Sequence, residues 1–138
     1  MTTLVDTNIL LDIATNDTKW VDWSLQQLDA AAVRGAVLIN AVIYAEFSVG
    51  YVRIEDLDKV LADVGLELTG IPRAALFLAG KVFQRYRGHG GIRTNVLPDF
   101  FIGAHAAVSE IPLLTRDPQR YRNYFPKIVL ITPDKIGH

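Results

Sequence analysis

Short apolar runs alternate with longer segments of helical spacing along the chain. Five of these runs have the length and the β-branched content of buried strands. They cover residues 2–5, 36–40, 66–70, 111–115 and 127–132. Strands that alternate with helices usually pair in parallel, with helices packed on both faces of the sheet. The pattern therefore predicts an α/β fold around a parallel sheet.

The segments between the runs repeat apolar residues every three or four positions, which is the spacing of a helix with one buried face. The last two segments open with Pro72 and Pro98, and proline suits the first position of a helix. The glycine-rich stretch 87–95 predicts a flexible loop instead. Helices are predicted over residues 18–33, 41–50, 54–64, 72–87 and 98–109.

Composition narrows the class of protein. The chain has 138 residues, of which 50% are hydrophobic and 21% charged, so we expect one globular domain over residues 1–138. It has no cysteine, which excludes disulfides and thiolate metal sites and suits the reducing cytoplasm. We expect no signal peptide and no membrane span. The net charge of −1 does not indicate nucleic-acid binding, so any such surface must come from local charge.

Four acidic residues stand where predicted strands end or helices begin: Asp6, Glu46, Asp99 and Asp117. In open parallel sheets, ligands bind at the carboxyl ends of the strands. Each acid also has a structural alternative. Asp6 suits a helix cap, and Asp99 suits the positive end of a helix. Asp117, before a proline, suits a turn, and Glu46 suits an exposed helix face.

Glu46 and Asp99 fit these alternatives least well, because apolar residues stand on both sides of each. A carboxylate in such a setting is costly unless a cation or hydrogen-bond donor meets it. Several carboxylates in one pocket also raise one another's pKa, which a divalent cation would relieve. Oxygen ligands without cysteine or a paired histidine motif suit Mg²⁺ or Mn²⁺ better than Zn²⁺.

Four stretches carry a family resemblance: "LVDTNILLD", "AEF", "LPDFFIGAHA" and "LLTRDPQRYRNYFP". Between Leu4 and Pro133 the chain resembles the PIN-domain ribonucleases, and among them the VapC-type toxins of type II toxin–antitoxin systems. The resemblance implies a three-layer α/β/α sandwich with a central parallel sheet of four to five strands. It also implies an endoribonuclease that uses Mg²⁺ or Mn²⁺ to hydrolyse RNA phosphodiesters.

The resemblance implies roles for the acids as well. Asp6, Asp99 and Asp117 would be metal ligands, and Glu46 would bind a second ion or orient the attacking water, so that all four are catalytic. Whether the site holds one ion or two remains open. The expected partners are RNA, a second copy of the chain and a cognate VapB-type antitoxin, through which alone the toxin would reach DNA. The segments 18–33 and 54–64 are candidate antitoxin surfaces.

Neighbouring residues are assigned supporting roles. Thr7, Asn8 and Thr115 are predicted to hold the acids in place, although Thr7 or Asn8 could equally cap a helix. Asp12 is expected to be a peripheral or solvated acid and not a metal ligand. Candidate RNA-binding residues are Arg85, Arg87, Arg93 and Arg116, with Arg120, Arg122, Tyr121 and Tyr124 close by in sequence. Ordinary exposed arginines and core tyrosines are the alternative.

Two other functions remain open from the sequence. The chain could be a PIN-like nuclease of RNA processing or a flap-type DNA nuclease, although its short length favours the toxin. It could also be a non-catalytic RNA-binding module with the same fold. The presence of all four acids counts against the module.

Overall fold

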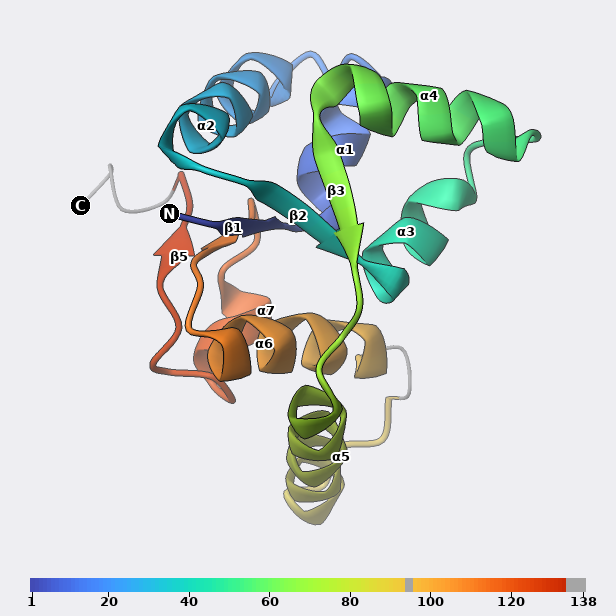
Figure 1. Ribbon diagram of the computed structural model, residues 1–138. Helices are drawn as coiled ribbons and strands as arrows, with labels where there is room; N and C mark the ends of the chain where they lie inside the picture. The colour runs from blue at the N-terminus through green and yellow to red at the C-terminus, as the bar shows by residue number, and fades with distance from the viewer. Residues whose placement is uncertain (94–95, 134–138) are drawn as a thin grey trace.

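The computed structural model describes residues 1–93 and 96–133, and its centre is a five-stranded parallel sheet (Figure 1). The strands run in the order β3-β2-β1-β4-β5, so β1 lies in the middle. All four strand pairings are parallel, which confirms the predicted sheet. The strands are β1 (Thr3–Val5), β2 (Val37–Asn40), β3 (Leu66–Thr69), β4 (Leu113–Leu114) and β5 (Leu130–Ile131).

Helices cover both faces of the sheet and complete the predicted three-layer sandwich. In Figure 1, α1, α2 and α4 lie on one side of the sheet, and α5, α6 and α7 lie on the other. The bounds are α1 (Thr7–Ala14), α2 (Val21–Arg34), α3 (Ala41–Ser48), α4 (Ile54–Val64), α5 (Arg73–Gly88), α6 (Leu97–Ser109) and α7 (Gln119–Arg122). Within the described residues, no helix is both long and apolar enough to cross a membrane.

The core lies on both sides of the two central strands. Leu4, Val5, Leu113 and Leu114 are completely buried, because β1 and β4 have neighbours at both edges and helices on both faces. This explains the continuous apolar runs, which have no polar face to give to solvent. Because these strands are buried, a polar residue directly after one of them lies inside the protein.

The helix predicted over residues 54–64 has the same bounds as α4, and the boundaries of the other predicted helices differ from the structure by at most three residues. Pro98 is the second residue of α6, which begins at Leu97, and Pro72 immediately precedes α5. α2 begins at Val21, because Asp17 Oδ1 accepts hydrogen bonds from the backbone of Lys19 and Trp20 and forms a turn there. Helix α7 was not predicted, since four residues carry no periodic signal.

The glycine-rich stretch is partly helical, because α5 continues to Gly88. Gly90 has a φ of +89°, a conformation that favours glycine. At Gly91 a Cβ would stand 2.4 Å from the Tyr86 ring, so the chain needs a glycine to pass the ring this closely. Residues 94 and 95 of the predicted loop lie outside the described residues, and its flexibility stays a prediction.

Gly103 allows α6 to pack against Phe125, and this contact predicts a loss of stability on substitution. A Cβ at Gly103 would stand 2.5 Å from two atoms of the buried Phe125 ring. We expect Gly103→Ala to lower the free energy of unfolding by about 1–3 kcal/mol in urea titrations, through overpacking.

Gly80→Ala is the matched control, because Gly80 also lies inside a helix but has no atom within 4 Å of an added Cβ. It should raise the free energy of unfolding by about 0.5–1 kcal/mol through helix propensity. Equal effects of the two substitutions would contradict the predicted packing at Phe125.

Candidate metal centre

Asp6 leaves the sheet at the end of β1 and is completely buried. Its Oδ1 accepts a hydrogen bond of 2.7 Å from the backbone N–H of Thr7 and so caps α1. Its Oδ2 accepts from Thr115 Oγ1 and Tyr121 Oη, both at 2.8 Å. The capping role and a place in the site are therefore not alternatives, because the two oxygens of one carboxylate face different partners.

Burial raises the pKa of Asp6 above its ordinary value. The positive charge of Arg120 opposes this rise, and so do the hydrogen bonds from Tyr121, Thr115 and Thr7. The effect of burial is the largest of these influences. Asp6 is thus an acid that the fold holds at an energetic cost, which is common where a carboxylate has a chemical task.

Glu46 reaches the same region from α3 and is half-buried. Its Oε1 accepts a hydrogen bond of 2.6 Å from Thr7 Oγ1, which links it to the residue after Asp6. Burial raises the pKa of Glu46, the hydrogen bond from Thr7 lowers it, and the charge of Asp6 raises it further. The alternative of an exposed helix face is therefore wrong for Glu46, which lies close enough to Asp6 to sense its charge.

Asn40 sets the position of α3 by capping it. The Asn40 Oδ1 accepts from the backbone N–H of Ile43 at 3.0 Å. Its Nδ2 lies 3.1 Å from His105 Nδ1 on α6, so one buried amide connects the elements that carry Glu46 and Asp99. His105 is itself buried, and burial lowers its pKa. This histidine packs and hydrogen-bonds within the core, as expected from its small apolar neighbours.

Asp99 and Asp117 both approach Arg120, which the sequence indicated only as one of the arginines near Asp117. Asp99 lies in the first turn of α6, and its Oδ1 accepts a hydrogen bond from Arg120 Nη2. The Oδ2 of Asp117 lies 3.9 Å from Arg120 Nε. Burial works to lower the pKa of Arg120, but the hydrogen bond to Asp99 and nearby negative charges raise it above its ordinary value.

Two of the predicted supporting residues form hydrogen bonds around the loop after β4, and Asn8 reaches this loop instead of a carboxylate. Thr115 Oγ1 donates to Asp6 and accepts from Asn8 Nδ2 at 3.3 Å and from the backbone N–H of Asp117 at 3.1 Å. Asn8 Oδ1 accepts from the backbone N–H of Arg116 at 3.2 Å. These bonds attach the loop after β4 to the start of α1. Their effect on a bound ion stays a prediction.

Asp12 is buried, with 2% of its surface exposed, so the expectation that it is solvated is wrong. Both of its oxygens accept hydrogen bonds of 2.8 Å from Arg116, and Ser24 Oγ donates a third at 2.7 Å. The Arg116 guanidinium also lies 5.2 Å from the centre of the Trp20 ring. This bidentate pair holds the loop between Thr115 and Asp117 in place. A direct role for Arg116 in RNA binding stays a prediction.

A hollow of about 420 Å³ opens beside Asp99, Asp117 and Arg120. Tyr86, Arg93 and Tyr124 also line it, and the Arg85 guanidinium lies 6.0 Å from the centre of the Tyr124 ring. Arg87 lies over Phe83 further along α5. Tyr121 is completely buried and hydrogen-bonds Asp6, so it packs rather than facing a base. Cationic and aromatic side chains thus surround the acids on the open side.

The donor set suits Mg²⁺ or Mn²⁺ in its chemistry, because it consists of carboxylate and hydroxyl oxygens. Among the described residues, however, no three acidic or histidine side chains converge closely enough to hold an ion as they stand. Arg120 explains this arrangement. Its guanidinium lies between Asp99 and Asp117 and supplies the positive charge that the acids require.

The sequence profile of the PIN domain matches residues 3–126, which is most of the chain. The chain belongs to the PIN-domain family. Among functionally curated proteins, none is similar enough in sequence to match it.

Solved structures share this PIN fold at low sequence identity. A chain in the crystal structure of VapBC2 from Rickettsia felis, bound to a DNA fragment from their promoter, has a TM-score of 0.72 and 21% identity, covering 96% of this chain and 98% of that one. A chain of VapBC-1 from nontypeable Haemophilus influenzae has a TM-score of 0.69 and 16% identity, with the same coverage. A chain of a toxin–antitoxin complex from Klebsiella pneumoniae has a TM-score of 0.66 and 22% identity, covering 92% of this chain and 95% of that one.

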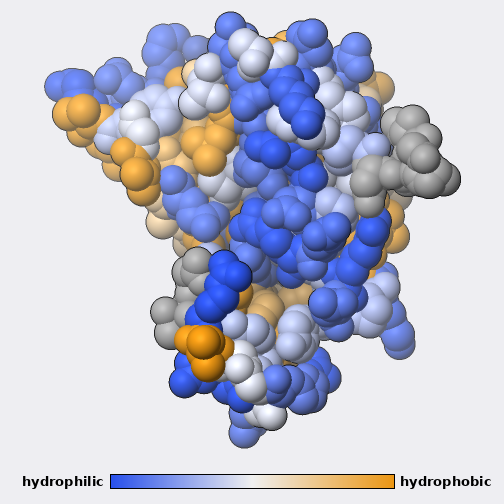
Figure 2. Space-filling model, turned by 180° about the vertical axis from the view of Figure 1, so that it is seen from behind, coloured by the Kyte–Doolittle hydropathy of each residue, from blue (hydrophilic) through white to orange (hydrophobic). Residues whose placement is uncertain are grey.

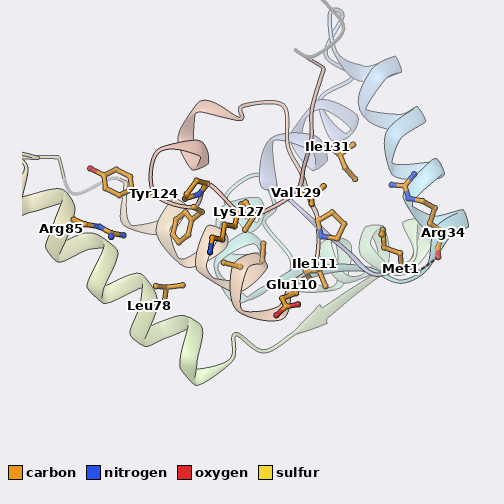
Figure 3. Close-up of a pocket in the computed structure, with 16 residues that line it drawn as sticks. Met1, Arg34, Leu78, Arg85, Glu110, Ile111, Tyr124, Lys127, Val129 and Ile131 are labelled. Carbon is orange, nitrogen blue, oxygen red and sulfur yellow. Dashed lines mark hydrogen bonds between the residues drawn. The ribbon is translucent and has the colours of Figure 1, made fainter.

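This PIN domain has a second, larger pocket of about 1070 Å³ (Figure 3). It lies between α5, the end of α6 and the segment that leads into β5, and Met1 and Arg34 border it. Most of its lining is apolar, and Glu110 is the one acid among the residues that line it. None of the four predicted acids reaches it, so the smaller hollow beside Arg120 is the candidate site.

The burial of Asp6 predicts how stability depends on pH. Its pKa is raised in the folded protein, so the folded state binds the proton more tightly, and stability falls as pH rises from the unfolded pKa through the folded one. In EDTA at pH 7, Asp6→Asn should raise the free energy of unfolding by about 1 kcal/mol. The gain should shrink as pH falls towards 4, because the folded carboxyl is then protonated and the unfolded one begins to be protonated as well.

Asp117→Asn is the control, because the Asp117 side chain is 48% exposed and a surface change of this kind alters stability by about 0.5 kcal/mol or less. Urea titrations between pH 4 and pH 8 measure both variants. A loss of stability in Asp6→Asn at pH 7 would mean that the hydrogen bonds of Asp6 outweigh the cost of its burial.

Proposed function

We propose that this PIN domain is the toxin of a type II toxin–antitoxin system and acts as a Mg²⁺- or Mn²⁺-dependent endoribonuclease. The observation that carries the proposal is that Glu46 lies close enough to Asp6 and Asp99 to sense their charges, while Arg120 connects Asp99 with Asp117. PIN-domain toxins are generally nucleases, which supports phosphodiester hydrolysis as the reaction class.

Each acid has a role that suits its surroundings. Asp6 is held by three donors, so its orientation is set before any ligand arrives. Asp6, Asp99 and Asp117 would hold a divalent ion, which when bound lowers the pKa of its water and offsets charge on the phosphate. Glu46 has a raised pKa and is anchored by Thr7, which suits a group that orients water and accepts its proton.

The positive side chains around the hollow would bring RNA to these acids. Arg93 lines the hollow itself. Arg85 lines the larger pocket and lies near Tyr124, which borders both cavities. Phosphate contacts of this kind attract a nucleic acid without selecting its sequence. We therefore propose Arg85, Arg87 and Arg93 as RNA-binding residues. The net charge of −1 is compatible with this, because only the local charge around the hollow matters.

We propose a VapB-type antitoxin as the partner that neutralises the toxin in the cytoplasm. The relatives reported above are VapBC or toxin–antitoxin complexes, and one of them is bound to promoter DNA. We propose that the antitoxin makes the DNA contact, so that this chain would reach DNA only indirectly.

A second copy of the chain is the other proposed partner. Hydrophobic side chains gather on the side of the molecule where α3 leads into α4, at the upper left of Figure 2. Val49, Val52 and Ile54 are exposed there by 87%, 102% and 62%. Exposed apolar clusters commonly mark protein interfaces. We propose that this patch, defined by these three residues, lies in a homodimer contact.

The patch predicts the effect of a charge on assembly. Val52→Asp combined with Ile54→Asp should convert a dimer into a monomer in sedimentation equilibrium, because burying two carboxylates opposes association. Val33→Asp, which alters another exposed valine on α2, should leave the mass unchanged. A monomeric wild type, or a double variant that remains dimeric, would refute the assigned contact.

The nuclease proposal predicts metal-dependent cleavage that requires Asp99. Purified protein incubated with total RNA in Mg²⁺ or Mn²⁺ should give discrete products, and EDTA should stop the reaction. Asp99→Asn should reduce the rate by about a thousandfold, since it removes a ligand from the centre that stabilises the transition state. Asp29→Asn, an exposed acid on α2, should cleave like the wild type.

The position of Arg120 also supports the alternative function, a non-catalytic RNA-binding module. A guanidinium between the acids would also suit a PIN fold that has lost catalysis and only binds RNA. In that case RNA would bind without being cut, and Asp99→Asn would bind as well as the wild type. Cleavage that continues in EDTA would exclude the metal mechanism.

A further inference from the structure

Arg120 is the cation that the four acids share. Its Nη2 donates to Asp99, and its Nε faces Asp117 at 3.9 Å. Its positive charge also lowers the pKa of Asp6 and of Glu46. The side chain is 31% exposed, so it stands at the boundary between the buried acids and the hollow.

The other partners of the buried acids are neutral. Asp6 accepts from a backbone N–H and from two hydroxyls, and Glu46 accepts from a third hydroxyl. Hydrogen bonds of this kind orient a carboxylate but bring no positive charge. Arg120 is therefore the cation that balances this part of the molecule as it is described.

We propose that Arg120 is a built-in substitute for the divalent ion, and that the ion and the Arg120 guanidinium compete for the same carboxylates. This inference rests on the proposed metal-dependent function. The reason is one of geometry and charge. Asp99 Oδ1 cannot give the same lone pair to a guanidinium and to a metal, and two cations this close repel each other.

The Arg120 side chain has space to move away from the acids. The hollow of about 420 Å³ lies directly beside its side chain. Arg120 is carried by α7, which has only four residues and no side-chain cap at its N-terminus, and it lies 5.8 Å from the Tyr121 ring. A change of side-chain rotamer would move the guanidinium into the hollow while the backbone stays in place. There it would line the opening through which a phosphate approaches.

Competition has two consequences for the free protein. The affinity for the ion is lower than four carboxylates alone would give, because Arg120 must first leave. The fold, in turn, does not depend on the ion, since the acids keep a counter-charge without it. Removal of the guanidinium should therefore increase metal affinity and make the metal-free protein less stable at neutral pH.

The experiment measures Mn²⁺ binding by calorimetry, with free Mn²⁺ counted by electron paramagnetic resonance. Arg120→Gln should bind Mn²⁺ at least about tenfold more tightly than the wild type, because the competitor is gone. Arg120→Lys keeps the charge but loses the planar fork, so its affinity should lie between the two. Arg34→Gln is the matched control, because it removes an exposed arginine near the start of β2, at the opposite end of the sheet. It should bind like the wild type.

A second readout is measured on the wild-type protein and does not depend on Arg120→Gln. In the ¹⁵N spectrum of the wild type, the Arg120 Nη2–H group, which donates to Asp99, should be protected from exchange in EDTA and lose that protection when Mg²⁺ is added. The signal is assigned by its absence from the spectrum of Arg120→Lys. This measurement follows the guanidinium itself, so it stands even where Arg120→Gln folds poorly.

Three results would overturn the inference. Equal affinity in the wild type and Arg120→Gln would remove the competition but leave the metal-dependent nuclease intact. Weaker binding in Arg120→Gln would mean that Arg120 organises the ligands instead of competing with the ion. No Mn²⁺ binding in any variant would overturn both this inference and the proposed metal mechanism.

Discussion

The site depends on one buried carboxylate at the end of the central strand. Asp6 follows a strand whose residues are completely buried, so its charge starts inside the protein. Thr7, Thr115 and Tyr121 hold its two oxygens, and these three residues come from α1, the loop after β4 and α7. A single acid thereby joins segments more than 100 positions apart in sequence, and its burial makes a counter-charge necessary.

The rest of the arrangement follows from that requirement. Glu46 and Asp99 add negative charge in this region, and the charges of Asp6 and Asp99 both raise the pKa of Glu46. In the structure, the nearby positive charge comes from Arg120. The bidentate pair of Asp12 and Arg116 holds the loop that carries Thr115 and Asp117, and the charge of Asp117 helps to raise the pKa of Arg116. The fold thus uses one arginine to fix the loop and another to balance the acids.

Much of the fold could be predicted from the sequence, because its central strands are buried on both faces and so consist of unbroken apolar runs. The approach of Asp6, Glu46 and Asp99 was also predictable, since parallel strands deliver their ends to one edge. The burial of Asp12 was not, because its partner Arg116 lies 104 positions away. Helix α7 was missed for its length, and the role of Arg120 was missed with it. The spacing of three residues between Asp117 and Arg120 was the one local signal for their contact.

The most direct test of a divalent metal centre is a crystal structure of the wild type grown with Mn²⁺, with anomalous differences measured at a wavelength sensitive to manganese. We predict one strong anomalous peak or two at coordination distance from the carboxylate oxygens of Asp6 and Asp99, with Arg120 turned into the hollow. A map without such a peak, with Arg120 still bound to Asp99 at saturating Mn²⁺, would contradict the assignment of these acids as metal ligands.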